Sequence, residues 1–441
     1  FVFSHFRGYS MRASAEEISP IKKKISIEIP EDRVTREVDS IYKELGRTAK
    51  IKGFRPGKVP RNILERYFKD YVKTEVVRKL MEESYPEALS ETHLEPVAPP
   101  VVDPGEFAEG KPFQYSAVIE VKPEIRLEGY TGLKIEGKKE EVKDEEVEER
   151  LKALQNLHSN LKTISEARTI QAGDYVILNY EASLNGKPVE GGKAIDFTVE
   201  VGSGQFIPAF EEKLIGLKPE EERDIEVTFP QDYGYQKWAG KTISFHVKIK
   251  EIKEKILPPL DDEFAKDLGD YSSLGELKAK LKGEIEKEKE LALDRQLKDH
   301  VVDQLLEANP FEVPESLVEE QAKALVSDTK LKLAAQGVVL KNLGVSEEKL
   351  QEDYKAMAQK QVRTFLILEK IAGQEGIAVT DQEAEDRLKE MSERMHQKFD
   401  VVKQYYEKNG LLPEVKPEVK AGIIRDKALS FLLEKANIHY V

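Results

Sequence analysis

The spacing of apolar residues changes twice along this chain of 441 residues, and this change limits the possible folds more than any other feature. Residues 18–121 mix alternating with helical spacing, residues 175–252 carry short alternating runs between turns, and residues 274–436 carry almost only helical spacing. One sheet or one helical bundle cannot satisfy all three patterns. The sequence therefore predicts a multidomain α+β protein.

The composition excludes several kinds of site. The chain has no cysteine, so it forms neither disulfides nor thiolate metal sites, which suits a reducing cytoplasm. The seven histidines are scattered without the spacing of metal ligands, and no phosphate-binding glycine loop precedes a lysine. We therefore expect no metal, no ATP and no other cofactor. No apolar run is long enough to span a bilayer, so no membrane association is expected.

Residues 11–125 are predicted to form a basic α+β domain. Between residues 11 and 80, 18 Lys and Arg stand against 11 Asp and Glu, a net charge of +7 in a chain whose total is −14. A basic module on an acidic body suggests that only this part seeks a polyanion. Residues 1–10 are too short and too polar for a signal peptide, and we treat them as an extension of unknown role. The expected elements are strands at 18–29 and 113–121 and helices at 31–50 and 60–91.

A short basic loop, Gly53–Pro60, joins the two expected helices. Glycine and proline restrict its backbone, and an aromatic side chain, Phe54, stands beside Arg55 between Lys52 and Lys58. A turn between helices is usually only a solvated connection, but an exposed aromatic among cations suits docking. The ring can fill an apolar notch, while the cations pair with phosphates or carboxylates. The candidate docking residues are Lys52, Gly53, Phe54, Arg55, Pro56, Gly57 and Lys58.

The remaining chain divides into three further parts. Residues 126–164 are expected to be a linker, with a Glu- and Lys-rich part at 136–152 followed by a leucine-bearing helix. Residues 165–255 carry the alternating runs of a compact β domain, and residues 256–441 are expected to be helical. The predicted helices of this last part are 274–308, 314–336, 346–373, 380–408 and 417–436.

The β-rich part resembles an FKBP-type peptidyl-prolyl isomerase. The resemblance rests on the strand Val176–Tyr180, the hairpin Gly186–Gly192 and the Gly-led turn Gly202–Phe210 into a helix. It implies a half-open antiparallel sheet wrapped on one short helix. It differs from the family pattern at Val189, Glu190 and Phe210, where an aromatic, an Asp and a Trp are common. The implied pocket residues are Tyr180, Val189, Glu190, Phe197, Phe206, Ile207, Phe210, Tyr235 and Phe245.

This residue set suits isomerisation of X–Pro peptide bonds. Rotation about an amide bond costs about 18–20 kcal/mol because it breaks resonance. The twisted state carries less charge on its carbonyl oxygen, so an apolar aromatic cleft favours it over the planar state. No nucleophile, base or metal is needed. The Tyr235 hydroxyl is a candidate hydrogen-bond donor to a substrate carbonyl, and Glu190 a candidate partner for a neighbouring hydroxyl or amide. The plainer alternative is that these aromatics are only barrel core.

The order of the parts resembles the bacterial trigger factor family. That family joins a ribosome-binding domain, an FKBP-type isomerase and a helical chaperone domain, and its docking signature is similar to Gly53–Pro60. Other members often have a basic residue at the position of Pro56. The resemblance implies a cytoplasmic, ATP-independent chaperone for nascent and unfolded polypeptides, active in folding, export and cell division. It implies docking to ribosomal protein L23 near the exit tunnel, with ribosomal RNA as a further contact.

Two other functions remain open from the sequence, as does a homodimer away from the ribosome. One is a free prolyl isomerase or holdase that acts on finished proteins, and the other is an extracytoplasmic isomerase–chaperone. The helical part offers apolar side chains that either bind clients or pack against each other. These candidates are Leu350, Met357, Val362, Phe365, Leu366, Leu411, Leu412, Ile423 and Phe431.

Overall fold

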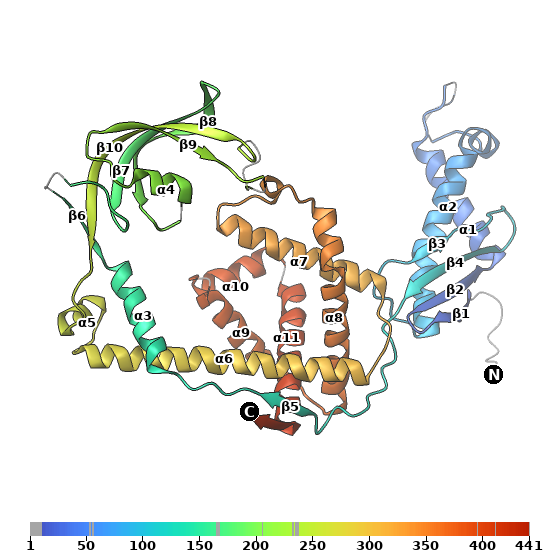
Figure 1. The fold of residues 1–441 in the computed structure, drawn as a ribbon. Helices are drawn as coiled ribbons and strands as arrows, with labels where there is room; N and C mark the ends of the chain where they lie inside the picture. The colour runs from blue at the N-terminus through green and yellow to red at the C-terminus, as the bar shows by residue number, and fades with distance from the viewer. Residues whose placement is uncertain are drawn as a thin grey trace. The chain divides into compact units, whose positions relative to one another are not determined.

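A computed structural model describes residues 11–52, 54, 57–164, 168–204, 206–231, 233, 238–394, 396–410 and 412–440. The chain divides into two compact units (Figure 1). One contains the chain through Gly137 and again from Arg295 onward, and the other contains Lys138–Asp294. The expected multidomain α+β fold is confirmed, because antiparallel sheets and a largely helical C-terminal part are both present.

The N-terminal part is an antiparallel sheet packed on two helices. Its strand order is β1-β2-β4-β3, and the inward side chains of β2 and β4 join the core formed with α1 and α2. The predicted single strand at 18–29 is instead a hairpin. Its first strand is exposed along most of both faces and lacks apolar alternation, so only its pairing with β2 reveals it, for example Glu17 opposite Lys23. The elements are β1 (Arg12–Ser19), β2 (Lys22–Ile29), α1 (Glu31–Thr48), α2 (Arg61–Thr92), β3 (Val101–Asp103) and β4 (Phe113–Glu120).

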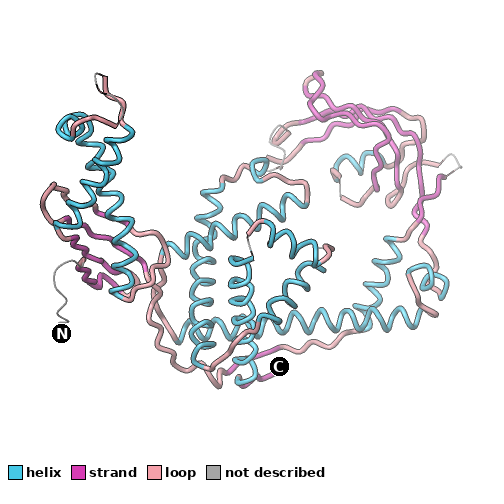
Figure 2. The backbone as a smooth tube through the Cα atoms, turned by 180° about the vertical axis from the view of Figure 1, so that it is seen from behind, coloured by secondary structure: helices cyan, strands magenta, loops and turns pink. Residues whose placement is uncertain are grey.

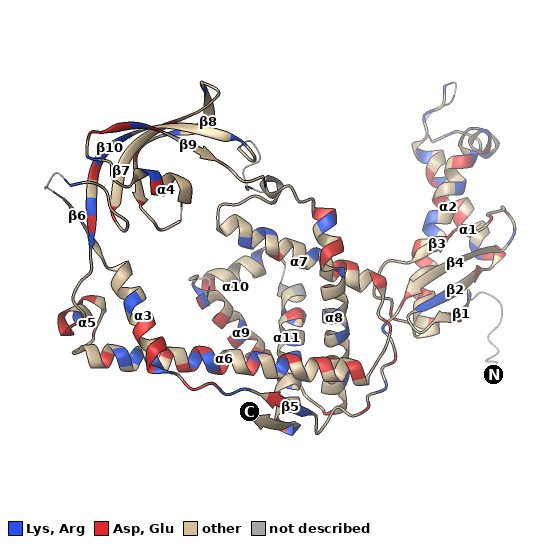
Figure 3. Ribbon diagram, in the orientation of Figure 1, with Lys and Arg blue, Asp and Glu red and all other residues tan. Residues whose placement is uncertain are grey.

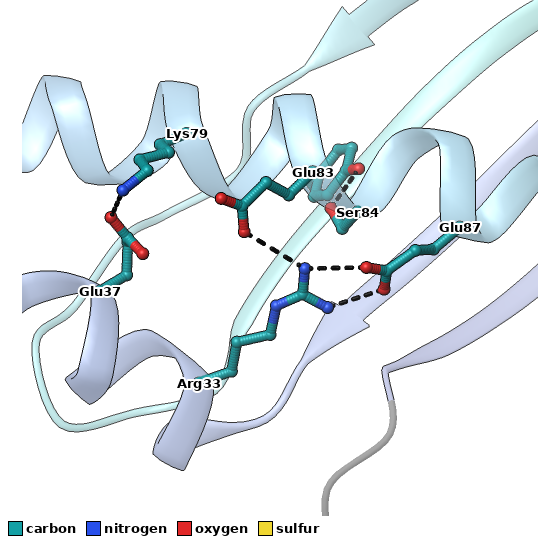
Figure 4. Close-up of polar contacts among 7 residues, drawn as sticks. Arg33, Glu37, Lys79, Glu83, Ser84 and Glu87 are labelled. Atoms are coloured by element: carbon teal, nitrogen blue, oxygen red, sulfur yellow. Dashed lines mark hydrogen bonds and ion pairs between the residues drawn. The ribbon is translucent and has the colours of Figure 1, made fainter.

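Polar contacts brace α1 against α2, and α2 against the sheet. Arg33 on α1 makes a bidentate pair with Glu87 on α2, with nitrogen–oxygen distances of 2.7 and 3.1 Å (Figure 4). One turn away, Lys79 pairs with Glu37 at 2.6 Å. Ser84 on α2 hydrogen-bonds the Tyr115 hydroxyl of β4 at 2.8 Å in the buried interior. The fork-shaped pair fixes direction as well as distance, so the two helices are held in one orientation.

The second unit is built around a curved antiparallel sheet. Its strand order is β6-β10-β7-β8, and β9 pairs with the N-terminal half of β10. The short helix α4 packs on this sheet, while α3 and α5 pack with the start of α6 in a separate apolar cluster. The elements are α3 (Asp144–Leu157), β6 (Asn160–Thr163), β7 (Tyr175–Leu184), β8 (Lys187–Glu200), α4 (Pro208–Leu214), β9 (Glu222–Thr228), β10 (Thr242–Ile256) and α5 (Asp262–Leu268).

The segment expected to be a linker, 126–164, has structure of its own. It contains β5 (Lys134–Gly137) as well as α3 and β6. The Glu- and Lys-rich part does not merely precede a helix, because α3 begins at Asp144 inside it. Three acidic residues lie in the first turn of α3, where they suit the positive end of the helix dipole. Leu161, expected on the same helix, lies instead on β6, which pairs with β10.

The C-terminal part is helical, as predicted (Figure 2). The predicted helix 380–408 is wrong as one element, because His396 adopts a left-handed conformation with φ 55° and separates α9 from α10. A final strand that the pattern did not predict, β11, pairs in parallel with β5. The elements are α6 (Leu274–Ala308), α7 (Glu315–Ala335), α8 (Glu347–Gln374), α9 (Asp381–Arg394), α10 (Phe399–Lys408), α11 (Leu412–Lys435) and β11 (Asn437–Tyr440).

Charges of both signs alternate along α6 and the other long helices (Figure 3). Among the described helices, none has both the length and the apolarity that crossing a bilayer requires. Within the same residues, no group of three or more His, Asp or Glu side chains is placed to hold a metal ion.

Candidate functional site

Five aromatic side chains meet in the second unit, from four different elements. Tyr180 of β7 lies at the centre, with its ring 5.5 Å from Phe197 of β8 and 5.7 Å from Phe245 of β10, measured between ring centroids. Phe210 of α4 lies 5.2 Å from Phe245 and 5.3 Å from Phe206. Most of these pairs are edge-to-face, the geometry that aromatic quadrupoles prefer. Residues separated by up to 65 positions in sequence thus form one continuous aromatic surface.

Burial divides this aromatic cluster into a floor and a rim. Phe210 and Phe245 are completely buried, so they form the floor and support the other rings from below. Phe197 and Phe206 are half-buried, as is Val189, and they form the part of the cluster that solvent reaches. Ile207 is buried beside them. The structure therefore brings together seven of the nine implied pocket residues in one apolar core.

Tyr180 contributes an apolar ring rather than a charge. Burial raises the pKa of its phenol above the ordinary value, so the hydroxyl stays protonated at neutral pH. Rotation about an X–Pro peptide bond breaks no covalent bond, so it needs no general acid, general base or metal. The last two implied pocket residues are not placed: Tyr235 and the side chain of Glu190 lie outside the described residues.

A bulge in β8 delivers Phe197 to the cluster. Leu178 pairs with Phe197, but Tyr180 pairs with Ala194, so β8 has one extra residue between these two pairs. Asp196 accommodates the bulge in a left-handed conformation, φ 54°, and its N–H donates to the side-chain oxygen of Asn179 at 2.9 Å. Lys250 pairs with Asp196. Sequence reasoning missed this device, because an Asn in one strand gives no sign of its partner in another.

Close packing also explains a glycine beside the rim. A Cβ atom built on Gly192 would lie 2.5 Å from Cγ2 of Val189 and 2.8 Å from Cβ of Ala182. Any side chain there would push Val189 out of its place. The glycine was visible in the hairpin motif, but the reason for it appears only when β7 and β8 are paired.

The candidate docking loop, Gly53–Pro60, lies between two buried anchors. Ala49, just after α1, and Val59, just before α2, are both buried in the N-terminal core. Between them, Phe54 exposes 38% of its surface, although its N–H donates to the Ile51 carbonyl at 3.1 Å. An aromatic ring held at the surface of a loop whose ends are buried is available to a partner. Gly53, Arg55 and Pro56 lie outside the described residues.

The cations around this loop differ in availability. Lys52 and Lys58 are exposed, and neither forms an ion pair within the part of the chain that the structure describes. Arg61, by contrast, is engaged by Asp39 at 2.5 Å and by Glu65 at 2.7 Å. It ties α1 to α2 and is not free for a phosphate. Lys52 and Lys58 are therefore the described cations next to Phe54 that a partner can use.

The apolar candidates of the helical part mostly pack inward. Val362, Leu366 and Ile423 are buried, and Leu350, Phe365 and Phe431 are partly buried. Met357 is exposed. Leu411 and the side chain of Leu412 lie outside the description. The exposed apolar side chains are largely ones that the sequence did not single out: Leu331, Val339, Leu343, Met391, Val401 and Tyr405.

Three family models match separate parts of the chain. Residues 11–154 match the model of the bacterial trigger factor protein, and residues 273–434 match the model of its C-terminus. Residues 166–250 match the FKBP-type peptidyl-prolyl cis-trans isomerase. The fold and the aromatic pocket therefore define a multidomain chaperone with an FKBP-type prolyl isomerase domain.

Comparison with whole proteins extends the match to almost the full chain. The trigger factor of Geotalea daltonii is 37% identical over 428 residues, which cover 97% of this chain and 98% of the relative. That of Geobacter metallireducens is 39% identical over 427 residues, which cover 97% and 98%. A solved trigger factor chaperone shares the fold with a TM-score of 0.51 at 20% identity, covering 96% of this chain and 99% of that one. The chain belongs to the trigger factor family, and it is a peptidyl-prolyl isomerase.

Proposed function

We propose that this chain is an ATP-independent chaperone that docks at the ribosome in the cytoplasm, holds nascent polypeptides open and isomerises their X–Pro bonds, assisting folding and export. One observation carries the docking part: Phe54 is exposed beside two lysines that form no ion pair with any described residue, on a loop whose ends are buried. Residues 11–125 would bind the ribosome, 126–164 connect, 165–255 isomerise and 256–441 hold clients.

The proposed partner of the docking loop is a ribosomal protein with an acidic rim and an apolar notch. An aromatic ring gains most when it is removed from water in a fitted pocket, which protein surfaces offer more readily than phosphate backbones. Lys52 and Lys58 would then pair with carboxylates of that protein or with nearby RNA phosphates. Protein L23 near the exit tunnel, the partner implied by the family, is the specific proposal, with ribosomal RNA as the secondary contact.

The proposed isomerase site is the rim formed by Phe197, Phe206 and Val189 above the floor of Phe210 and Phe245. Tyr180, Ile207, Glu190 and Tyr235 complete the set. A prolyl ring would lie on the rim with its amide bond in the apolar cleft. Because the twisted amide is less polar than the planar one, this environment lowers the barrier to rotation. The support is the continuous contact among the rings, from 5.1 Å between Phe197 and Phe206 to 6.4 Å between Tyr180 and Phe210.

The proposed client surface is the exposed apolar side chains of the helical part. Leu331, Val339 and Leu343 lie on and just after the end of α7, and Val401 and Tyr405 lie on α10. Separate apolar side chains bind unfolded segments by area, without demanding a sequence. A homodimer away from the ribosome stays a prediction, which sedimentation velocity over a range of concentrations would test.

Co-sedimentation with ribosomes tests the docking proposal. Replacing Phe54, Arg55 and Pro56 together by alanine should abolish binding, because the apolar anchor and a cation are lost at once. Tyr67→Ala is the matched control, since this tyrosine is an exposed aromatic of the same module, 66% exposed on α2 but outside the loop. Binding that survives the triple replacement contradicts the docking proposal and favours a free isomerase that acts on finished proteins.

A further inference from the structure

Glu211, in the middle of the short helix α4, is almost completely buried, with 1% of its surface exposed. Its carboxylate accepts three backbone hydrogen bonds from the described residues of the loop that precedes the helix. Oε2 accepts from the N–H groups of Gly202 and Gly204, both at 2.9 Å, and Oε1 accepts from the N–H of Phe206 at 3.0 Å. The FKBP-like motif does not single out this residue as part of the pocket.

These hydrogen bonds explain why a charge is tolerated in the interior. Burying a carboxylate without partners is costly, and a carboxylate can only accept, so it requires donors. The loop provides them because Gly202 and Gly204 adopt left-handed conformations, with φ of 89° and 69°, which turn successive N–H groups toward one point. The loop and the carboxylate therefore satisfy each other, and neither is stable in this arrangement alone.

The third of these bonds reaches the rim of the pocket. Phe206 is the residue whose N–H meets Oε1, and its ring lies 5.1 Å from Phe197 and 6.1 Å from Tyr180. A fixed backbone at Phe206 also fixes its Cα–Cβ bond, from which the ring extends. Phe206 is only half-buried and lies in the turn before α4 rather than in a helix or strand, so packing alone holds it weakly.

We propose that Glu211 is a positioning residue of the isomerase, which acts by holding the Phe206 backbone so that its ring closes the rim over the prolyl substrate. The inference rests on the aromatic pocket proposed above and assigns the residue that keeps it in shape. Glu211 touches no substrate in this arrangement. Its effect on the reaction passes through Phe206.

The substitution Glu211→Gln separates the hydrogen bonding of this side chain from its size. Glutamine has the same size but presents an NH2 group in place of one oxygen. Whichever way the amide is turned, a donor then faces at least one backbone N–H, and a hydrogen bond is lost. Glu212→Gln is the matched control, because Glu212 is the next residue of the same helix, is exposed and makes no side-chain hydrogen bond in the described part of the chain.

A double-mutant cycle on the full-length protein tests the proposal. The rate of cis–trans exchange of a short peptide with one X–Pro bond, followed by NMR, gives kcat/KM without a coupling enzyme. We expect Glu211→Gln to lower kcat/KM about tenfold, the effect of one lost hydrogen bond near the reacting group. Phe206→Ala should lower it at least as much, and the double variant should be no worse than Phe206→Ala alone. Glu212→Gln should match the unmodified protein.

Two results would overturn the inference while leaving the pocket intact. One is unchanged activity of Glu211→Gln, and the other is a double variant whose loss is the product of the two single losses, because independent effects multiply. If Phe206→Ala itself leaves kcat/KM unchanged, the proposed pocket fails and this inference fails with it.

Two measurements separate positioning from misfolding. The only tryptophan of the chain, Trp238, packs on Phe229 and Phe245 of the same domain, with ring centroids 5.3 and 6.2 Å away, so its fluorescence reports whether that domain is folded. Hydrogen exchange needs no variant. The Phe206 amide of the unmodified protein should exchange at least about tenfold more slowly than an unprotected loop amide. Exchange at the unprotected rate would contradict the proposal.

Discussion

The docking loop and the isomerase pocket both depend on phenylalanine, but they use it in opposite ways. Phe54 leaves 38% of its surface exposed, whereas Phe210 and Phe245 are completely buried among other rings. The candidate docking loop would present Phe54, Lys52 and Lys58 to a partner, while its ends are anchored in the N-terminal core. The pocket is a continuation of the domain core. We therefore expect changes in the loop to weaken ribosome binding without altering stability, and changes in the pocket floor to lower the stability of the isomerase domain without altering ribosome binding.

The largest effect is expected for Phe210→Ala, which tests the pocket side of this comparison. Removing a completely buried ring should lower the free energy of unfolding of the isomerase domain by about 3–5 kcal/mol. Denaturant unfolding followed by Trp238 fluorescence measures this change, and ribosome binding should not change. Ile195→Ala, in an exposed position of β8, is the control and should stay within about 0.5 kcal/mol. A loss below about 1 kcal/mol for Phe210→Ala would mean that the floor is not part of the core.

The next effect concerns the loop and separates its ring from its charges. Phe54→Ala should weaken ribosome binding by about 2 kcal/mol at every salt concentration, because the apolar contact is not screened. Replacing Lys52 and Lys58 by alanine should weaken binding mainly at low salt. Binding titrations at two ionic strengths measure both. Equal salt dependence of the two variants would show that Phe54 is not an independent anchor.

A third prediction concerns a buried charge that supports the isomerase domain. Burial alone would raise the pKa of Asp174, but hydrogen bonds from Arg168, at 2.6 and 2.7 Å, and from the Gln171 N–H outweigh it and lower the pKa below its ordinary value. A lowered carboxyl pKa stabilises the fold above the pKa of the unfolded chain, about 3.9, and this stability is lost as the pH falls through the lower folded value.

Asp174→Asn should therefore lower the free energy of unfolding by about 1–3 kcal/mol at pH 7. The difference from the unmodified protein should shrink as the pH falls below about 4, because the unfolded chain then binds a proton at Asp174 that the folded protein binds only at a lower pH. Unfolding followed by Trp238 fluorescence at several pH values checks this. A difference that stays constant from pH 7 to pH 3 would show that the charge of Asp174 contributes nothing. Replacement of Lys52 and Lys58 is the comparison from the docking loop, because it should not change the free energy of unfolding at any pH.

The smallest effect is expected for a matched pair of glycine substitutions, one in the docking loop and one in the isomerase domain. Gly57 in the docking loop and Gly186 in the β7–β8 turn both have positive φ, 82° and 77°, and a Cβ at either would meet no atom within 4 Å. Alanine should cost about 1 kcal/mol in each case, from backbone strain alone. Only Gly57→Ala should also weaken ribosome binding, by a few-fold. If Gly186→Ala weakens it equally, the loop has no special part in docking.

Much of the fold was predictable because local patterns dictate local elements. The buried side chains Val34, Val38 and Ile41 repeat at helical spacing, and α1 forms where that spacing occurs. The helix α6 has the predicted bounds because Asn309-Pro310 ends it. The hairpin of β1 was missed because both its faces are exposed, and the break at His396 was missed because no glycine or proline marks it.

The candidate sites were predictable to different degrees for the same reason. The docking loop is one continuous stretch, so its aromatic and its cations could be read directly from the sequence. The engagement of Arg61 by Asp39 could not be read, because the two residues come from different helices. In the pocket, the resemblance supplied the rings. It did not supply the hydrogen bond that the Phe206 N–H donates to Glu211 or the bulge at Asp196, because these depend on how loop, helix and strands come together.

The sequence by itself determined the order of the parts, the family, the exposed aromatic of the docking loop and the aromatic character of the pocket. Each of these depends on residues that are neighbours in the chain or that form a recognisable motif. The tertiary structure decided which cations stay free, which rings form floor and rim, and which carboxylate holds Phe206. These properties depend on burial and on hydrogen bonds between distant segments, and burial is defined only once the chain has folded.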